Sequence, residues 1–313
     1  MPADRQQTRA FALLGLVMLL WAGNSIVGRA VRLDVGPFTL AFVRWAGASL
    51  FLLPFALRPL RRDWPAILSG WKAILLLGGL GVAAFNALLY SGLQHTTATN
   101  ALLLQAAVPP AVMLFDRLFF GVRPGLWPSI GVMASVLGVV VIVFGGDPGA
   151  ALRLHFGLGD ALVLCSVAVW ALYTVFLRLR PPISPVSFIA VTFFIGVAAM
   201  APLALWEWRA GQGVAWSPGL GAAFLYVALL PSLLSYFIYN HATGVVGAAR
   251  AGQAITLMPL CGAFLAAALL GERLHAFHFA GMALILAGIV VAALTGRQEP
   301  AGAGAGPGLE DRR

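Results

Sequence analysis

Long apolar blocks dominate the chain, and short polar stretches separate one block from the next. Each block is close to the length of about 20 residues that crosses a bilayer core of roughly 30 Å as a helix. The stretches between them are too short to hold a soluble domain. The pattern therefore predicts an all-α membrane protein with ten transmembrane helices, at approximately residues 10–28, 37–57, 71–93, 98–119, 126–145, 158–177, 185–206, 218–239, 247–270 and 276–295.

Composition points to the same class of protein. The 313 residues are 60% hydrophobic and 10% charged, whereas a soluble domain has about 25% charged residues. The formal net charge is +9, but the basic residues sit in short loops rather than in one patch, which argues against a nucleic-acid partner. Cys165 and Cys261 fall inside predicted spans, and His275 and His278 have no further ligands at metal-site spacing. We expect no metal and no cofactor.

Basic residues are distributed unevenly between the two sides of the predicted membrane. If the N-terminus is cytoplasmic, inner segments hold fourteen of the 20 Lys and Arg residues, one (Arg44) lies within a span, and the outer loops hold Arg29, Arg32, Arg153, Arg209 and Arg273. The positive-inside rule then places both termini in the cytoplasm, in a bacterial inner membrane. Residues 1–9 are expected to form a cytoplasmic tail, and the Gly- and Ala-rich residues 297–313 a disordered one.

The chain also repeats itself. Trp21, Ala22 and Arg29 recur 149 residues later as Trp170, Ala171 and Arg178. Further along, the offset is 150, and it relates Pro109, Gly121, Arg123, Gly131 and Gly138 to Pro259, Gly271, Arg273, Gly281 and Gly288. This predicts two five-helix repeats, at 10–146 and 158–296. Because five is odd, the second repeat must be inverted in the membrane relative to the first, a recurring design of transporters.

Polar residues inside the spans fall at repeat-related positions. Asn86 and Tyr90 correspond to Tyr236 and Asn240 at the 150-residue offset. Such side chains are costly in a bilayer unless they face protein or water, so they line a cavity or form hydrogen bonds between helices. We favour a cavity between the repeats, with substrate-binding residues Asn24, Ser25, Arg44, Asn86, Tyr90, Gln105, Tyr173, Tyr236, Asn240 and Gln253.

Arg44 and three prolines add detail to this cavity. Arg44 could snorkel to the interface, or it could offer a bidentate partner to a carboxylate or phosphate. Pro109, Pro110 and Pro259 lack a backbone N–H, so we expect them to kink their helices. The spans place no carboxylate at mid-membrane, which predicts that transport is not tightly coupled to protons.

Several of these features together resemble the EamA family of the drug/metabolite transporter superfamily. They are the segment 21–25 (WAGNS), Arg44, Pro109, and Pro259 followed by 271–274 (GERL), and the likeness covers roughly residues 10–296. The first half departs from the pattern, with 121–123 reading GVR where an acid is expected. The resemblance implies a basket-like helical bundle that exports amino acids or related metabolites.

The interpretation is a secondary transporter that exports amino acids or related small metabolites by alternating access, and not an enzyme. Its expected partners are a small-molecule substrate and the lipid bilayer, with a homodimer left open. A channel or passive scaffold is the first alternative, and a membrane-embedded enzyme the second. Saturable flux would distinguish a carrier from a channel.

The charge asymmetry makes a topological prediction. A fluorescent reporter fused after Arg313 should be fluorescent in the cytoplasm, and an alkaline phosphatase fused there should be inactive. An active phosphatase at that position would place the C-terminus outside and contradict the prediction.

Overall fold

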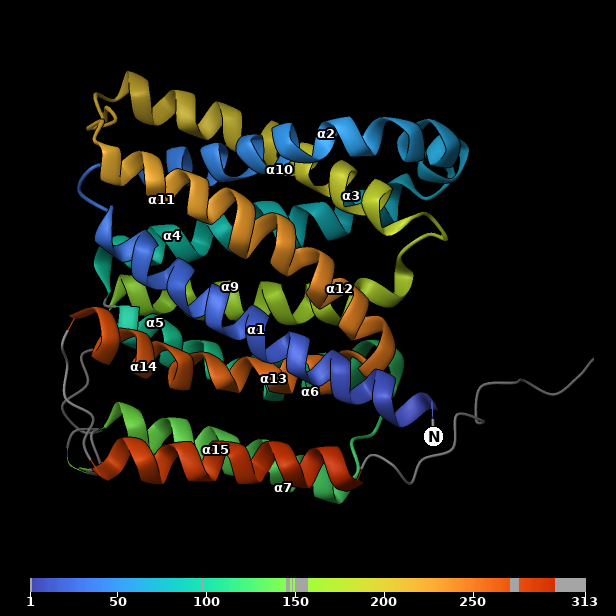
Figure 1. Cartoon of the computed structure of the whole chain (residues 1–313), viewed down its shortest axis with the longest axis vertical. Helices are drawn as coiled ribbons and strands as arrows, with labels where there is room; N and C mark the ends of the chain where they lie inside the picture. The colour runs from blue at the N-terminus through green and yellow to red at the C-terminus, as the bar shows by residue number, and fades with distance from the viewer. Residues whose placement is uncertain are drawn as a thin grey trace, which may run out of the picture.

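The structure, a computed structural model, describes residues 2–96, 98–144, 147, 149, 157–270 and 276–295. These residues form a bundle of helices without strands (Figure 1). Six helical segments are long and apolar enough to cross a membrane, and shorter apolar helices occupy Leu126–Gly138 and Phe279–Gly288. The chain is an all-helical membrane protein.

The described part of the first half contains seven α-helices, a π-helical turn and a 3₁₀ turn. In order they are α1 (Pro2–Ala30), α2 (Pro37–Ser69), α3 (Trp71–Gly78), the π-helix η1 (Gly79–Ala84), α4 (Phe85–His95), α5 (Ala98–Leu104), the 3₁₀ turn η2 (Gln105–Ala107), α6 (Val108–Phe120) and α7 (Leu126–Val143).

The second half follows the same order, apart from an extra 3₁₀ turn after its first helix. Its elements are α9 (Leu158–Phe176), the 3₁₀ turn η3 (Leu177–Leu179), α10 (Pro185–Arg209), α11 (Pro218–Ala228), the π-helix η4 (Leu229–Leu234), α12 (Ser235–Val246), α13 (Ala248–Ala254), the 3₁₀ turn η5 (Ile255–Leu257), α14 (Met258–Leu270) and α15 (Ala276–Thr295).

Each predicted apolar block coincides with one of these helices or with a helix that is interrupted by a turn. Three ends differ from the prediction, one of them that of the eighth block, which continues past residue 239 to Val246. The first helix begins at Pro2, so the described part of the predicted N-terminal tail is helical, and α2 continues past residue 57 to Ser69 despite three internal prolines. Residues 297–313 and the segment 271–274 lie outside the described residues.

Local helix defects recur at the repeat offset. The two π-helices begin at Gly79 and Leu229, and the 3₁₀ turns η2 and η5 begin at Gln105 and Ile255, which is 150 residues apart in both cases. The 3₁₀ turns lie just before Pro109 and Pro259, whose missing N–H groups cannot donate to the carbonyls four residues earlier. The prolines therefore interrupt both helices, as the sequence predicted.

The long helices α2 and α10 pack side by side and cap each other (Figure 1). Glu207, near the end of α10, accepts hydrogen bonds from the N–H groups of Phe38 (2.9 Å) and Thr39 (2.7 Å) at the start of α2. Asp63, near the end of α2, accepts one from the N–H of Ser184 at the start of α10 (2.8 Å). Each carboxylate satisfies free N–H groups and the positive end of a helix dipole, which stabilises the antiparallel pair.

Helices α7 and α15 pack against each other at the opposite edge of the bundle through glycines (Figure 1). A Cβ added to Gly138 would lie 2.5 Å from the carbonyl oxygen of Gly281, and one added to Gly288 would lie 2.3 Å from that of Gly131. Gly131 and Gly138 are the repeat counterparts of Gly281 and Gly288, so the two contacts are the same contact with the halves exchanged. A two-fold axis between the halves would produce this exchange.

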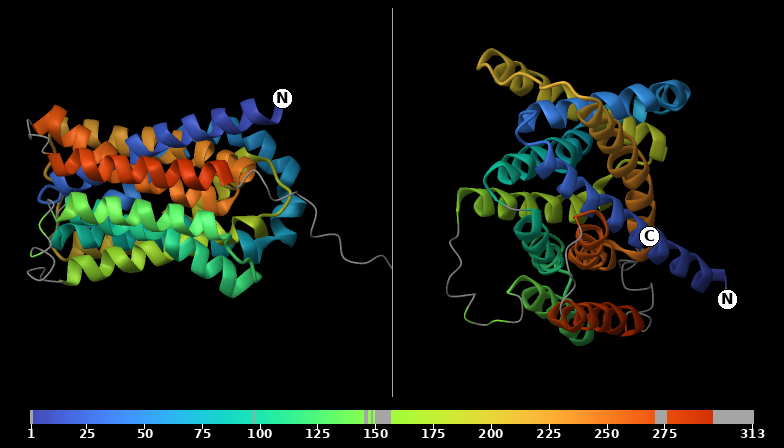
Figure 2. Two further views of the ribbon diagram at one scale, coloured as in Figure 1. Left: turned by 90° about the horizontal axis from the view of Figure 1, so that it is seen from below. Right: turned by 60° about the vertical axis from the view of Figure 1, so that its left-hand side comes forward.

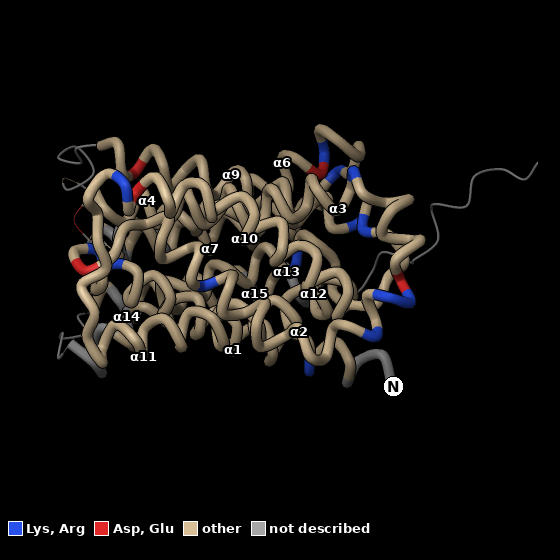
Figure 3. Tube along the Cα trace, turned by 90° about the horizontal axis from the view of Figure 1, so that it is seen from above, with Lys and Arg blue, Asp and Glu red and all other residues tan. Residues whose placement is uncertain are grey.

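The views from other directions show how the halves are oriented. The N-terminus and the end of α15 lie at one end of the bundle (Figure 2). Helix α1 begins at that end, whereas α9, its counterpart, begins at the other (Figure 1). Lys, Arg, Asp and Glu gather at the two ends and leave a largely uncharged zone between them (Figure 3). This is the charge distribution expected of a membrane-spanning bundle.

The glycine contacts between α7 and α15 can be tested directly. Gly138→Ala or Gly288→Ala should destabilise the protein by about 1–3 kcal/mol, because the opposing atoms include backbone that cannot move aside. Thermal unfolding in detergent measures the effect. Gly15→Ala in α1 is the control, since no atom lies within 4 Å of its added Cβ. Equal melting temperatures for all three variants would contradict the assignment.

Candidate functional site

Arg44 lies at the centre of a buried polar network. It belongs to the buried face of α2 and is only 2% exposed, so it does not reach out to the interface. Its Nη1 donates hydrogen bonds to Asn24 Oδ1 (3.0 Å), Asn86 Oδ1 (3.0 Å) and the hydroxyl oxygen of Tyr90 (2.8 Å). The Tyr90 hydroxyl donates in turn to Asn24 Oδ1 (2.8 Å). Three helices of the first half thus converge on one guanidinium.

The same guanidinium also contacts the second half. Arg44 Nε donates to the hydroxyl oxygen of Ser232, and Nη2 donates to the carbonyl oxygen of Pro231 (3.1 Å). Both acceptors belong to the π-helix η4. The indole of Trp21 donates to the same Pro231 oxygen (2.9 Å). Arg44 therefore joins the two halves.

All of these acceptors are neutral. Among the described residues the recorded ion pairs lie elsewhere, Arg62 with Asp63 and Arg178 with Asp116, and no carboxylate contacts Arg44. The Trp45 ring lies 4.7 Å from the guanidinium carbon and adds a cation–π contact. A buried cation is costly without a counter-ion, even when dipoles solvate it. The centre of the bundle is thus electropositive and suited to an anionic group.

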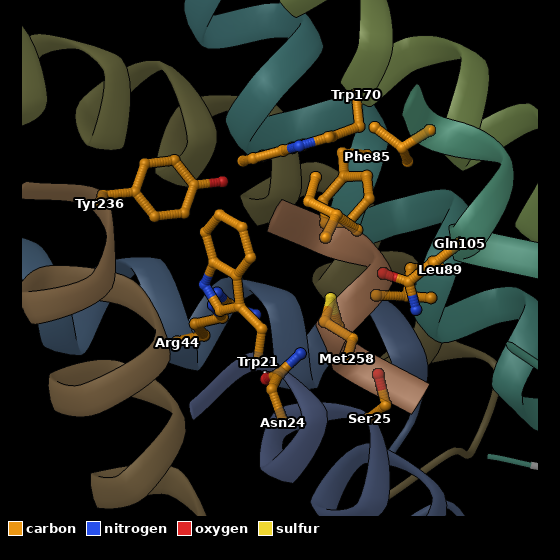
Figure 4. Close-up of a pocket in the computed structure, with 12 residues that line it drawn as sticks. Trp21, Asn24, Ser25, Arg44, Phe85, Leu89, Gln105, Trp170, Tyr236 and Met258 are labelled. Atoms are coloured by element: carbon orange, nitrogen blue, oxygen red, sulfur yellow. Dashed lines mark hydrogen bonds between the residues drawn. The ribbon is translucent and has the colours of Figure 1, made fainter. Parts of the chain in front are cut away.

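A small cavity lies beside Arg44 (Figure 4). Its volume is about 20 Å³, enough for a water molecule but far below the roughly 300–1,000 Å³ of a typical small-molecule pocket. The hydroxyl of Ser25, which lines it, is fully buried and has no hydrogen-bond partner. The remaining lining residues are Trp21, Asn24, Arg44, Phe85, Leu89, Gln105, Val108, Trp170, Tyr236, Ile255 and Met258.

Aromatic rings form one wall of this cavity. Trp21 and Trp170, which are repeat counterparts, touch edge to face with ring centroids 5.0 Å apart. The ring centroid of Tyr236 lies 5.9 Å from that of Trp170 and 5.4 Å from that of Trp45. The Tyr236 hydroxyl donates to the carbonyl oxygen of Gly81 in the other π-helix, η1. Figure 4 shows Trp21, Trp170 and Tyr236 on one side of the cavity. Counterparts that touch each other lie at the meeting point of the two halves.

Each half contains one Tyr–Asn hydrogen bond, and the tyrosine and the asparagine occupy exchanged positions in the two halves. In the first half the hydroxyl of Tyr90 donates to Asn24, and in the second half that of Tyr173 donates to Asn240 (both 2.8 Å). Tyr173 occupies the position of Asn24, and Asn240 that of Tyr90. Each half thus joins its first and third predicted spans by the same bond in the opposite direction.

Larger cavities open at the two ends of the bundle. One of 620 Å³ is lined by residues that include Ser91, Gln94 and Glu207, and one of 400 Å³ by residues that include Thr174 and Asn240. None of their lining residues lines the central cavity. The central cavity is therefore distinct from both vestibules and has no lining residue in common with them.

The structure distributes the predicted site residues over three places. Asn24, Ser25, Arg44, Gln105 and Tyr236 line the central cavity, and Asn86 and Tyr90 contact Arg44. Tyr173 and Asn240 form the separate flanking pair. Gln253 points elsewhere and donates to the carbonyl oxygen of Gly288 in α15 (3.0 Å).

Several contributors to the centre were missing from the prediction. Ser232 was visible in the sequence, one turn before Tyr236, and the recurrence of Trp21 as Trp170 marked two aromatic residues at matching depths. The carbonyl of Pro231 left no such signal, since any residue has a carbonyl and only the packing of α1 and α2 against η4 makes this one a partner of Trp21 and Arg44.

Comparison with known proteins fits this architecture. The profile of the EamA-like transporter family matches residues 8–144 and 157–294. An uncharacterized transporter of Archaeoglobus fulgidus is 29% identical over 90% of this chain and 96% of its own length. The uncharacterized inner membrane transporter YedA of Escherichia coli is 24% identical over 98% of each chain. A solved crystal structure superposes with a TM-score of 0.68 at 19% identity, and covers 93% of this chain and 98% of its own.

The two Tyr–Asn pairs allow a matched test of the network. Tyr173→Phe removes a bond between neutral groups and should cost about 0.6 kcal/mol of unfolding free energy. Tyr90→Phe also removes an acceptor from the Arg44 guanidinium and should cost about 1.5–3 kcal/mol. Unfolding by denaturant in micelles measures both losses. If the two variants lose the same amount of unfolding free energy, the hydrogen bond between Tyr90 and the Arg44 guanidinium does not contribute to stability.

Proposed function

Because this chain belongs to the EamA-like transporter family, we propose that it is a secondary transporter that carries small solutes across a bacterial inner membrane by alternating access. The full-length relatives include proteins named uncharacterized transporters, and YedA of Escherichia coli is named an inner membrane transporter. The central cavity holds about one water molecule and shares no lining residue with either vestibule, which favours a carrier over a channel with a continuous wide pore.

The proposed architecture is ten transmembrane helices in two inverted five-helix repeats. Three features of the described residues support it: the defects spaced by 150 residues, the exchanged glycine contacts of α7 with α15, and the opposite starting ends of α1 and α9. In such carriers the solute binds near the midplane between the repeats. Residues of both halves line the cavity beside Arg44, which supports such a position for it.

The observation that carries the proposal is the buried guanidinium of Arg44, which has only neutral partners beside a cavity. A carboxylate or phosphate on the solute would supply the missing negative charge through two parallel hydrogen bonds. The aromatic wall of Trp21, Trp170 and Tyr236 would contact an apolar body. Amino acids and related carboxylate metabolites combine both features, and we propose their export as the function.

Substitution of Arg44 tests this assignment. In proteoliposomes, saturable flux of a ¹⁴C-labelled amino-acid mixture should fall at least about tenfold in Arg44→Gln, because the solute carboxylate loses its charged partner. Arg44→Lys retains the charge but loses the planar fork, so its flux should be intermediate. Arg58→Gln, on an exposed position of the same helix, is the control and should match the wild type.

Binding measurements distinguish a variant that has lost the binding site from one that has lost the fold. Amino acids should raise the melting temperature of the wild-type protein, and their amides, which lack the anionic group, should not. Arg44→Gln should retain a cooperative unfolding transition and lose the stabilisation by amino acids. Undiminished flux in folded Arg44→Gln would refute the role of this residue in binding.

A further inference from the structure

Arg44 does more than offer a positive charge to the solute, because it ties the halves together. Its acceptors from the first half are Asn24, Asn86 and Tyr90, and those from the second half are Ser232 and the Pro231 carbonyl. Trp21 adds a parallel bond to the Pro231 oxygen. Any rocking of one half against the other must stretch or break the bonds to η4.

The cost of that movement depends on what replaces those bonds. An Arg44 that leaves Ser232 and Pro231 loses two of its acceptors in a buried, low-dielectric site. No carboxylate among the described residues lies within contact distance to replace them. The cavity of about 20 Å³ admits at most a water molecule beside it. Reorientation without solute is therefore opposed by desolvation of the guanidinium.

A bound carboxylate changes this balance. Its two oxygens can accept from the guanidinium in place of Ser232 and Pro231, and a bond between opposite charges is stronger than one to a neutral acceptor. The carboxylate must displace side chains to enter, because the cavity is smaller than any amino acid. Solute binding thus both loosens the link between the halves and supplies the charge that the moving Arg44 needs.

We propose that the protein is an exchanger, in which a carboxylate solute carried one way is replaced by another carried back, and in which Arg44 locks the solute-free carrier. The inference rests on the proposed function, since it concerns the same site. One carboxylate leaves as another binds, so Arg44 meets an anion during each movement of the halves. Differential binding of solute to the closed and the moving states is the only source of such control.

The test compares exchange with net efflux in proteoliposomes. Vesicles containing the protein are loaded with a ¹⁴C-labelled amino-acid mixture and diluted into buffer with or without the same mixture unlabelled. Efflux into the mixture should be at least about tenfold faster than efflux into buffer, because the return of the empty carrier is the slow step.

Ser232 provides the variant that weakens the lock, and Ser235 its matched control. Ser232→Ala removes one acceptor of the second half from Arg44 and should reduce the ratio of exchange to net efflux about fivefold, through faster net efflux. Ser235 is also a buried serine that donates to the carbonyl oxygen five residues earlier, but it does not contact Arg44. Ser235→Ala should leave the ratio unchanged.

The outcomes distinguish the two proposals. Saturable net efflux as fast as exchange would overturn the exchanger and leave the transport function standing. The wild type could show faster exchange than net efflux while Ser232→Ala keeps the same ratio of exchange to net efflux. That result would overturn the role of Arg44 as a lock on the solute-free carrier. Absence of saturable amino-acid flux in both modes would overturn the proposed function itself.

Discussion

The burial of one guanidinium without a counter-ion constrains the centre of this protein. Arg44 is stable there only because neutral acceptors from both halves surround it, among them the side chains of Asn24, Asn86 and Tyr90. The favourable energy of these dipoles offsets part of the cost of desolvating the charge. The same arrangement leaves the charge uncancelled and available to an anion. In the proposed function, the same group of bonds therefore determines both the stability of the fold and the attraction of a solute.

Carbonyl groups of the two helix defects bond to the opposite half. A helical carbonyl accepts from an N–H of its own helix, and its second lone pair can accept from a side chain of another helix. The carbonyls of Gly81 and Pro231 lie in the π-helices η1 and η4, and they accept from Tyr236 and from Trp21 and Arg44, respectively. The defects occur at the same place in both repeats, and each is used by the opposite half. The halves are therefore held together through their irregular turns.

Repetition of the backbone does not make the site symmetric. Helices α2 and α10 begin 148 residues apart, at Pro37 and Pro185. At this offset the counterpart of Arg44 is Thr192, whose hydroxyl donates to carbonyls of its own helix. Both halves contain a Tyr–Asn hydrogen bond, but the tyrosine of one half occupies the position of the asparagine in the other. The guanidinium at the centre therefore comes from the first half alone, although the two halves share the order of their elements.

The sequence by itself determined the all-helical membrane class, the positions of the apolar helices and the internal repeat, because length, hydropathy and proline act locally. It also marked Arg44, Asn24 and Tyr90, since polar groups are rare at that depth. It could not separate Gln253, which bonds to α15, from Gln105, which lines the cavity. Nor could it assign a role to the Pro231 carbonyl. Those distinctions depend on how helices rotate and where turns widen, and only the packing of distant segments decides them.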